Sequence, residues 1–134
     1  MKNGSRRGPD QTAPEPSQGK RVPAVFFRTE AGGEPVRAWL RSLPLADRKA
    51  IGTDIKAVEF GWPLGLPLCR PLQNGLFEVR TSLAGNRIAR VLFYVDKLGR
   101  MVLLHGFIKK TQKTPDRDLA LALSNKSKHE RGLA

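Results

Sequence analysis

Three apolar segments that follow one another closely in the second half of the chain constrain the fold most. They are residues 75–80, 87–95 and 101–108, and the stretches 84–86 and 96–99 that separate them have the composition of hairpin turns. Segments of strand length joined by such turns pair with their neighbours in the sequence. The sequence therefore predicts an antiparallel meander of three strands.

The chain before the meander has helical periodicity. A short strand is expected at residues 24–28, and two amphipathic helices should follow, one opening at Pro35 and one after Pro44, with a stop at Gly61 and Pro63. Their apolar positions recur every three or four residues: Val36, Trp39, Leu40 and Leu43 in the first helix, and Ile51, Ile55 and Val58 in the second.

A third helix is expected after the meander. Thr114 has the side chain of an N-cap, Pro115 suits the first turn, and Asp116 favours the positive end of the helix dipole. The apolar side of this helix is formed by Leu119, Ala122 and Leu123. The resulting order, β-α-α-β-β-β-α, predicts an α+β fold, with an antiparallel sheet, the helices packed on one face, and the other face free for function.

The length of 134 residues fits one domain. Residues 1–21 are rich in Gly, Pro, Ser and charge without apolar periodicity, so we expect a disordered basic extension there. The domain should occupy residues 22–126, and residues 127–134 should form a flexible tail. Cys69 is the only cysteine, which excludes an intrachain disulfide and a cysteine zinc site. The length also leaves no room for an elaborate cofactor site, so no cofactor is expected. The single cysteine and the lack of an apolar run long enough for a bilayer predict a cytoplasmic location.

A formal charge of +12, from 24 Lys and Arg against 12 Asp and Glu, limits the classes of partner. Residues 1–21 hold only five of these basic residues and two of the acidic ones, so the expected domain is itself basic. A basic domain attracts polyanions without reading sequence. Nucleic acid or the ribosome is therefore the first partner to consider, and an anionic membrane surface the second.

Alternation along residues 87–95 separates two faces of the predicted sheet. Ala89, Val91, Phe93 and Val95 form a core face, whereas Ile88, Arg90, Leu92 and Tyr94 point the other way. Arg80, at the end of the preceding strand, lies close to one end of that surface. The sequence thus predicts a cationic floor with one phenol in it.

Several stretches of the chain resemble the HigB-like branch of the RelE/ParE toxin superfamily. They are Glu34-Pro35-Val36 with Trp39-Leu40, Gly75 to Arg80, Arg90 with Phe93-Tyr94, and the long run Leu103 to Pro115. The resemblance covers residues 24–123. It implies a RelE-like fold and a metal-independent endoribonuclease that cleaves messenger RNA on the ribosome. It also implies a cognate helix-turn-helix antitoxin that binds the toxin in a hetero-oligomer, and it implies no membrane partner.

Such cleavage needs the 2′-hydroxyl to attack phosphorus while other groups move protons and neutralise charge. Arg80 and Arg90 stay protonated, so in the cleavage reaction they would stabilise phosphates and could not act as bases. Alternatively, each forms a structural ion pair with Glu78 or Asp96. Tyr94 could stack on a base or exchange a proton if neighbouring cations lower its pKa, and its alternative is a rim aromatic with a solvated hydroxyl. His105 suits proton transfer near neutral pH, but a buried, hydrogen-bonded histidine is an equal reading.

Further basic residues are candidates for binding messenger or ribosomal RNA: Arg87, Lys109, Lys110 and Lys113. The alternative for the lysines is an ordinary solvated loop. Trp62 could pack on the domain or lie under the antitoxin. Two other functions stay open: a ParE-like toxin that inhibits gyrase, and a non-catalytic module that binds nucleic acid, although aromatic residues are few for a stacking platform.

Overall fold

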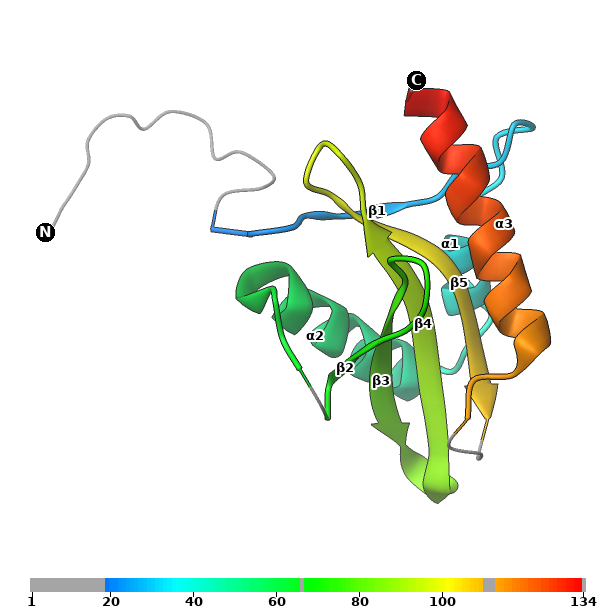
Figure 1. Cartoon of the computed structure of the whole chain (residues 1–134). Helices are drawn as coiled ribbons and strands as arrows, with labels where there is room; N and C mark the ends of the chain where they lie inside the picture. The colour runs from blue at the N-terminus through cyan, green and yellow to red at the C-terminus, as the bar shows by residue number, and fades with distance from the viewer. Residues whose placement is uncertain (1–18, 66, 110–112, 134) are drawn as a thin grey trace, which may run out of the picture.

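The computed structural model describes residues 19–65, 67–109 and 113–133, which form one five-stranded sheet and three helices (Figure 1). The strands are β1 (Ala24–Phe26), β2 (Cys69–Pro71), β3 (Phe77–Leu83), β4 (Arg87–Val95) and β5 (Met101–Lys109). The helices are α1 (Pro35–Arg41), α2 (Leu45–Gly61) and α3 (Asp116–Leu133), and a short 3-10 turn, Ala84–Asn86, joins β3 to β4.

The sheet has the order β1-β5-β4-β3-β2. The predicted meander is confirmed, because β3 pairs antiparallel with β4 and β4 antiparallel with β5. Two features differ from the expected order. The short strand β2 adds an antiparallel edge to β3, and β1 pairs with β5 in parallel, with α1 and α2 in the connection that follows β1. A three-residue edge strand gives too short a pattern for alternation to reveal it.

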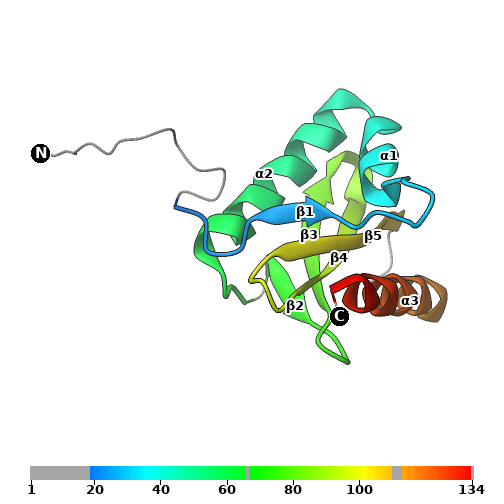
Figure 2. The same cartoon turned by 90° about the horizontal axis from the view of Figure 1, so that it is seen from above.

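Helices cover both faces of the sheet, which corrects the expectation that they share one face. In Figure 2, α1 and α2 lie on one side of the sheet and α3 on the other. The core under α1 and α2 contains the predicted face of β4, with Ala89, Val91 and Phe93 buried. A second core lies under α3 and contains Leu92 and Tyr94. Both faces of β4 carry apolar side chains, so burying both removes more apolar surface from water than covering one.

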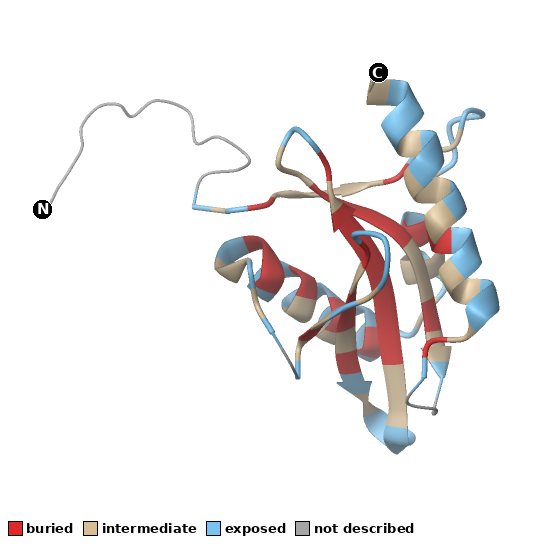
Figure 3. Cartoon of the chain, in the orientation of Figure 1, coloured by how far each residue is buried: buried red, intermediate tan, exposed pale blue. Residues whose placement is uncertain are grey.

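The first core depends on close contact between α1 and β5. A Cβ atom on Gly106 would lie 2.5 Å from two ring carbons of Trp39, so only glycine fits at this position. Trp62 packs on the same core, with its ring edge-on to Phe77 at 4.7 Å and to Phe93 at 5.5 Å between centroids. The reading that Trp62 packs on the domain is therefore confirmed. Figure 3 shows that β4 is buried along most of its length.

Polar contacts hold α3 to the sheet along its length. Asn125 donates a hydrogen bond to the carbonyl of Leu104 at 3.0 Å, and His129 lies 3.1 Å from the carboxylate of Asp96 in the turn between β4 and β5. Arg100 also binds Asp96, with 2.8 Å between its guanidinium and the carboxylate. The helix continues to Leu133, so residues 127–133, expected to be a tail, form its last turns.

The start of the described chain is attached to the end of α2. The backbone N–H groups of Arg21 and Val22 both donate to the carbonyl of Glu59, and Lys20 lies 3.1 Å from the Glu59 carboxylate. Residues 1–18 of the expected extension lie outside the described residues. Within the ranges that the structure describes, none of the helices combines the length and apolarity that a bilayer span requires.

Candidate functional site

Four charged side chains, Arg70, Glu78, Arg80 and Arg90, occupy neighbouring positions on the α3 side of the sheet; we call them the charged cluster. Arg80 is paired with Arg90 across β3 and β4, and Arg70 is paired with Glu78 across β2 and β3. Directly opposed residues of antiparallel strands have Cβ atoms about 5 Å apart. The strand register alone therefore places three guanidinium groups around one carboxylate.

Glu78 is the centre of this cluster. Its side chain is fully buried, one carboxylate oxygen lies 3.7 Å from Nε of Arg80, and the other accepts a short hydrogen bond from the hydroxyl of Thr114. Thr114 was expected as the N-cap of α3, but the helix begins at Asp116 and the carbonyl of Pro115 accepts its first hydrogen bond. The Thr114 hydroxyl instead joins the loop before α3 to the cluster.

The three arginines differ in their access to solvent. Arg90 is fully buried, whereas the side chain of Arg80 is 17% exposed and Arg70 is half-buried. Burial lowers the pKa of Arg90; Glu78 opposes this effect, and the positive charges of Arg80 and Arg70 add to it. A ligand can therefore approach Arg80 and Arg70, while Arg90 lies beneath them and contributes charge from below.

His105 lies on the same face, diagonally across from Arg90. It is paired with Leu92 at an irregularity between β4 and β5, and Phe107, next but one along β5, is paired with Arg90. Nε2 of His105 lies 2.7 Å from Oδ1 of Asp118 on α3, and its ring stacks on Phe107 at 5.7 Å between centroids. The imidazole is 20% exposed. A carboxylate that binds one ring nitrogen fixes the ring and leaves the other nitrogen to exchange a proton.

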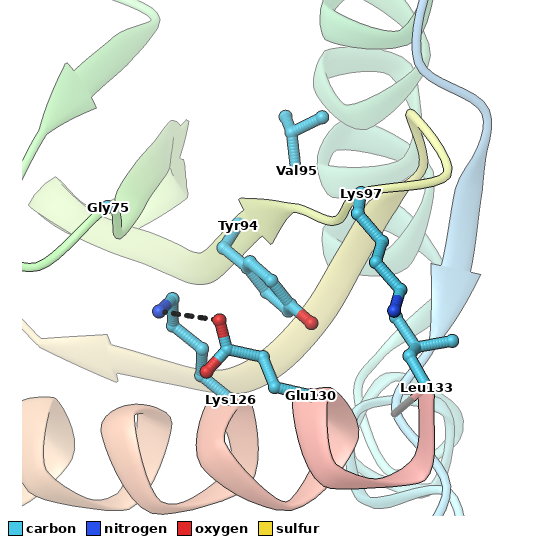
Figure 4. Close-up of a pocket in the computed structure, with 7 residues that line it drawn as sticks. All are labelled: Gly75, Tyr94, Val95, Lys97, Lys126, Glu130 and Leu133. Carbon is cyan, nitrogen blue, oxygen red and sulfur yellow. Dashed lines mark hydrogen bonds and ion pairs between the residues drawn. The ribbon is translucent and has the colours of Figure 1, made fainter.

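Tyr94 does not join the charged cluster. It is four residues from Arg90 along β4, which is about 13 Å at the usual rise per residue. The ring is buried under α3, with Nζ of Lys126 5.2 Å from its centroid (Figure 4), and the ring of His129 lies edge-on to it at 5.8 Å between centroids. Tyr94 therefore lies neither among the arginines of the charged cluster nor at a solvent-exposed rim, the two surroundings expected for it.

The lowered pKa that proton exchange by Tyr94 would require is not found. Burial, followed by the negative charges of Glu130 and Asp96, raises the pKa of Tyr94 to about 12, against an opposing effect of Arg100. Desolvation and nearby carboxylates both disfavour a phenolate. Tyr94 therefore stays protonated at neutral pH and cannot act as a base there.

Arg87 lies on the opposite face of the sheet and binds α2. Its guanidinium donates two hydrogen bonds to the carboxylate of Asp47, at 2.8 and 3.1 Å, and its Nε donates to the carbonyl of Ala84 at 2.8 Å. The hydrogen bonds from Arg87 outweigh burial and lower the pKa of Asp47. The structure thus places Arg87 in a link between sheet and helix, apart from the charged cluster.

Two lysines of the expected run lie within the described residues. Lys109, at the end of β5, and Lys113, next to Thr114, are both exposed, whereas Lys110 lies outside the described residues. Sequence reasoning did not identify Arg70 or Asp118 as site residues. Arg70 lies in a strand too short to show alternation, and Asp118 reaches His105 only because α3 crosses this face. Among the described residues, no three potential metal ligands come together.

The fold and the charged cluster define a small basic α+β protein whose sheet carries three guanidinium groups and a histidine–carboxylate pair on one face. Residues 38–127, more than half of the chain, match the family model described as phage-derived protein Gp49-like (DUF891), and the protein belongs to this family. The family is part of the RelE/HigB-like toxin superfamily; it suggests a toxin endoribonuclease and implies an antitoxin partner. No individual curated protein matches the sequence.

Proposed function

We propose that this protein is a HigB-type toxin that cleaves messenger RNA on the ribosome without a metal ion. The observation that carries the proposal is the charged cluster beside the His105–Asp118 pair on one face of the sheet. Cations next to a histidine held by a carboxylate are the groups that RNA cleavage by the 2′-hydroxyl requires. Membership of a toxin family supports the same reading.

In the proposed reaction, the 2′-oxygen attacks the adjacent phosphorus in line, and the bond from phosphorus to the 5′-oxygen breaks. Arg80 and Arg70 bind the phosphate oxygens, and Arg90 adds positive charge from beneath as negative charge accumulates. His105 exchanges a proton with the reacting oxygens, so that the 2′-hydroxyl loses one proton and the leaving 5′-oxygen gains one. The products are a 2′,3′-cyclic phosphate and a 5′-hydroxyl end.

The proposal assigns no catalytic role to Tyr94, because its buried, protonated hydroxyl lies at the other end of α3. Lys109 and Lys113 would bind phosphates of messenger or ribosomal RNA that flank the cleaved bond. We expect the ribosome to orient the message, which raises the rate by fixing the in-line geometry. A helix-turn-helix antitoxin would silence the protein in a cytoplasmic hetero-oligomer.

The test is to induce the protein in cells and map new 5′ ends on cellular messages by primer extension. We expect ends confined to translated regions. In a second experiment, purified protein should cut messages on ribosomes in EDTA as fast as without it, provided that the ribosomes are kept intact by other means. Substituting His105→Gln should slow cleavage about 100-fold, the usual scale for loss of a general acid or base. Arg80→Ala should cost roughly as much.

The matched control is Lys56→Ala, which removes an exposed cation of α2. It should leave both stability and cleavage unchanged. Growth arrest without new RNA ends, accompanied by loss of DNA supercoiling, would refute the proposal in favour of a gyrase inhibitor. Binding of RNA without growth arrest or cleavage would refute it in favour of a non-catalytic module.

A further inference from the structure

A hollow lies at the other end of α3 from the charged cluster, and the proposed reaction does not use it. Its volume is about 360 Å³, and it lies between α3, the end of β4 and the turn after β4 (Figure 4). The residues that matter for its chemistry are Tyr94, Val95, Lys97, Lys126, Glu130 and Leu133.

The hydroxyl of Tyr94 is the main indication that this hollow binds something. Tyr94 is only 4% exposed, and no described residue forms a hydrogen bond with its hydroxyl. In Figure 4 the hydroxyl points into the space between α3 and the side chain of Lys97. Burying a hydroxyl without a partner is unfavourable, so such groups call for an explanation. A ligand that accepts a hydrogen bond from Tyr94 would supply one.

The charges around the hollow select the kind of acceptor. Lys97 is exposed at its rim, and Lys126 is half-buried inside it, 3.2 Å from the carboxylate of Glu130. The pKa of Tyr94, about 12, makes its hydroxyl a donor at neutral pH. Tyr94 and both lysines are thus donors, and Glu130, the one acidic side chain among the described lining residues, already binds Lys126. The lining carries one positive charge in excess.

We propose that this hollow binds a carboxylate on an acidic peptide segment of a protein partner, with Tyr94 and Lys97 as its hydrogen-bond donors. A single carboxylate balances the excess charge, and Val95 and Leu133 provide apolar contact for the carbons that bear it. A nucleic-acid strand fits less well, because the lining has only one positive charge in excess and successive phosphates would also meet the exposed carboxylate of Glu130. The inference does not depend on RNA cleavage.

The experiment is an NMR titration of the full chain at neutral pH with N-acetyl-glutamate N-methylamide, following the amide signals of Val95, Lys97 and Leu133. We expect saturable shifts with this probe and none with the glutamine analogue, which has the same shape without the charge. Tyr94→Phe should weaken binding at least about tenfold, because it removes a hydrogen bond to a charged acceptor. The same variant should melt at or above the wild-type temperature, because the hydroxyl has no partner in the free protein.

Lys97→Ala should also weaken binding, and Lys56→Ala on α2 should not. Inorganic phosphate and a short single-stranded RNA serve as competing probes. The inference is wrong if the glutamine analogue binds as well as the glutamate probe, if phosphate or RNA shifts these signals more strongly, or if Tyr94→Phe binds with wild-type affinity. Each of these outcomes leaves the RNA-cleavage proposal intact, since that proposal rests on the charged cluster.

Discussion

Replacing Gly106 by alanine tests the packing that positions the candidate site. The new Cβ would lie 2.5 Å from Cε3 and Cζ3 of Trp39. Nonbonded carbons prefer about 3.5–4.0 Å, so the overlap is at least ~1 Å with two atoms of a rigid ring. Either β5 or α1 must move by that amount. Overpacking of this kind costs typically 1–3 kcal/mol, and with two atoms involved we expect about 3 kcal/mol.

For a domain of this size, such a loss lowers the melting temperature by roughly 10–20 °C, measurable by thermal and denaturant unfolding. Gly52→Ala is the matched control, because a Cβ at Gly52 in α2 would meet nothing within 4 Å. It should stabilise the protein by about 0.5–1 kcal/mol, since alanine favours a helix over glycine.

A double-mutant cycle with Trp39→Leu separates the proposed clash from other effects of the substitution. With the indole removed, Gly106→Ala should cost much less than in the wild type. Equal costs in the two backgrounds, or a Gly106→Ala variant as stable as the wild type, would refute the reasoning. Because Gly106 lies between His105 and Phe107, displacement of β5 should also reduce the proposed cleavage.

Three further predictions follow from buried groups. Arg90→Ala should destabilise the protein by about 3 kcal/mol in denaturant unfolding, because it leaves the buried carboxylate of Glu78 with less compensating charge; a loss below ~1 kcal/mol would contradict this account. Burial alone would raise the pKa of Asp96, but hydrogen bonds from Arg100 and His129 outweigh it and hold the pKa below its ordinary 3.8. The ionised carboxylate therefore stabilises the fold above about pH 4, and this contribution is lost as the pH falls through the lowered pKa. Asp96→Asn should make the melting temperature fall less steeply on the acid side. Burial raises the pKa of Cys69 to about 11, so only about one thiol in a thousand is ionised at pH 8. Iodoacetamide should therefore alkylate Cys69 slowly in the folded protein, as followed by mass spectrometry, and rapid alkylation would contradict this prediction.

Local patterns in the sequence predicted most of the secondary structure. Alternation placed Arg90 and Tyr94 on one face of β4 and Ala89, Val91 and Phe93 on the other, as the structure confirms. Proline and periodicity placed the starts of α1 and α2 within a residue or two. These patterns report short-range geometry, which the chain fixes over a few residues.

Such patterns could not predict which helix covers which face of the sheet. The sequence shows that Tyr94 points away from the first core, but the approach of α3 to that face depends on long-range contacts such as His129 with Asp96. The same packing buries Tyr94 and raises its pKa, and it brings Asp118 to His105. Burial and distant partners decide pKa values and site membership, and neither follows from spacing along the chain.

The buried carboxylate of Glu78 has a consequence for how the charged cluster and α3 depend on each other. Glu78 lies 3.7 Å from Nε of Arg80 and accepts a hydrogen bond from Thr114, so one buried carboxylate joins β3 to the loop before α3. A shift of the segment that leads into α3 would therefore move the carboxylate that holds Arg80.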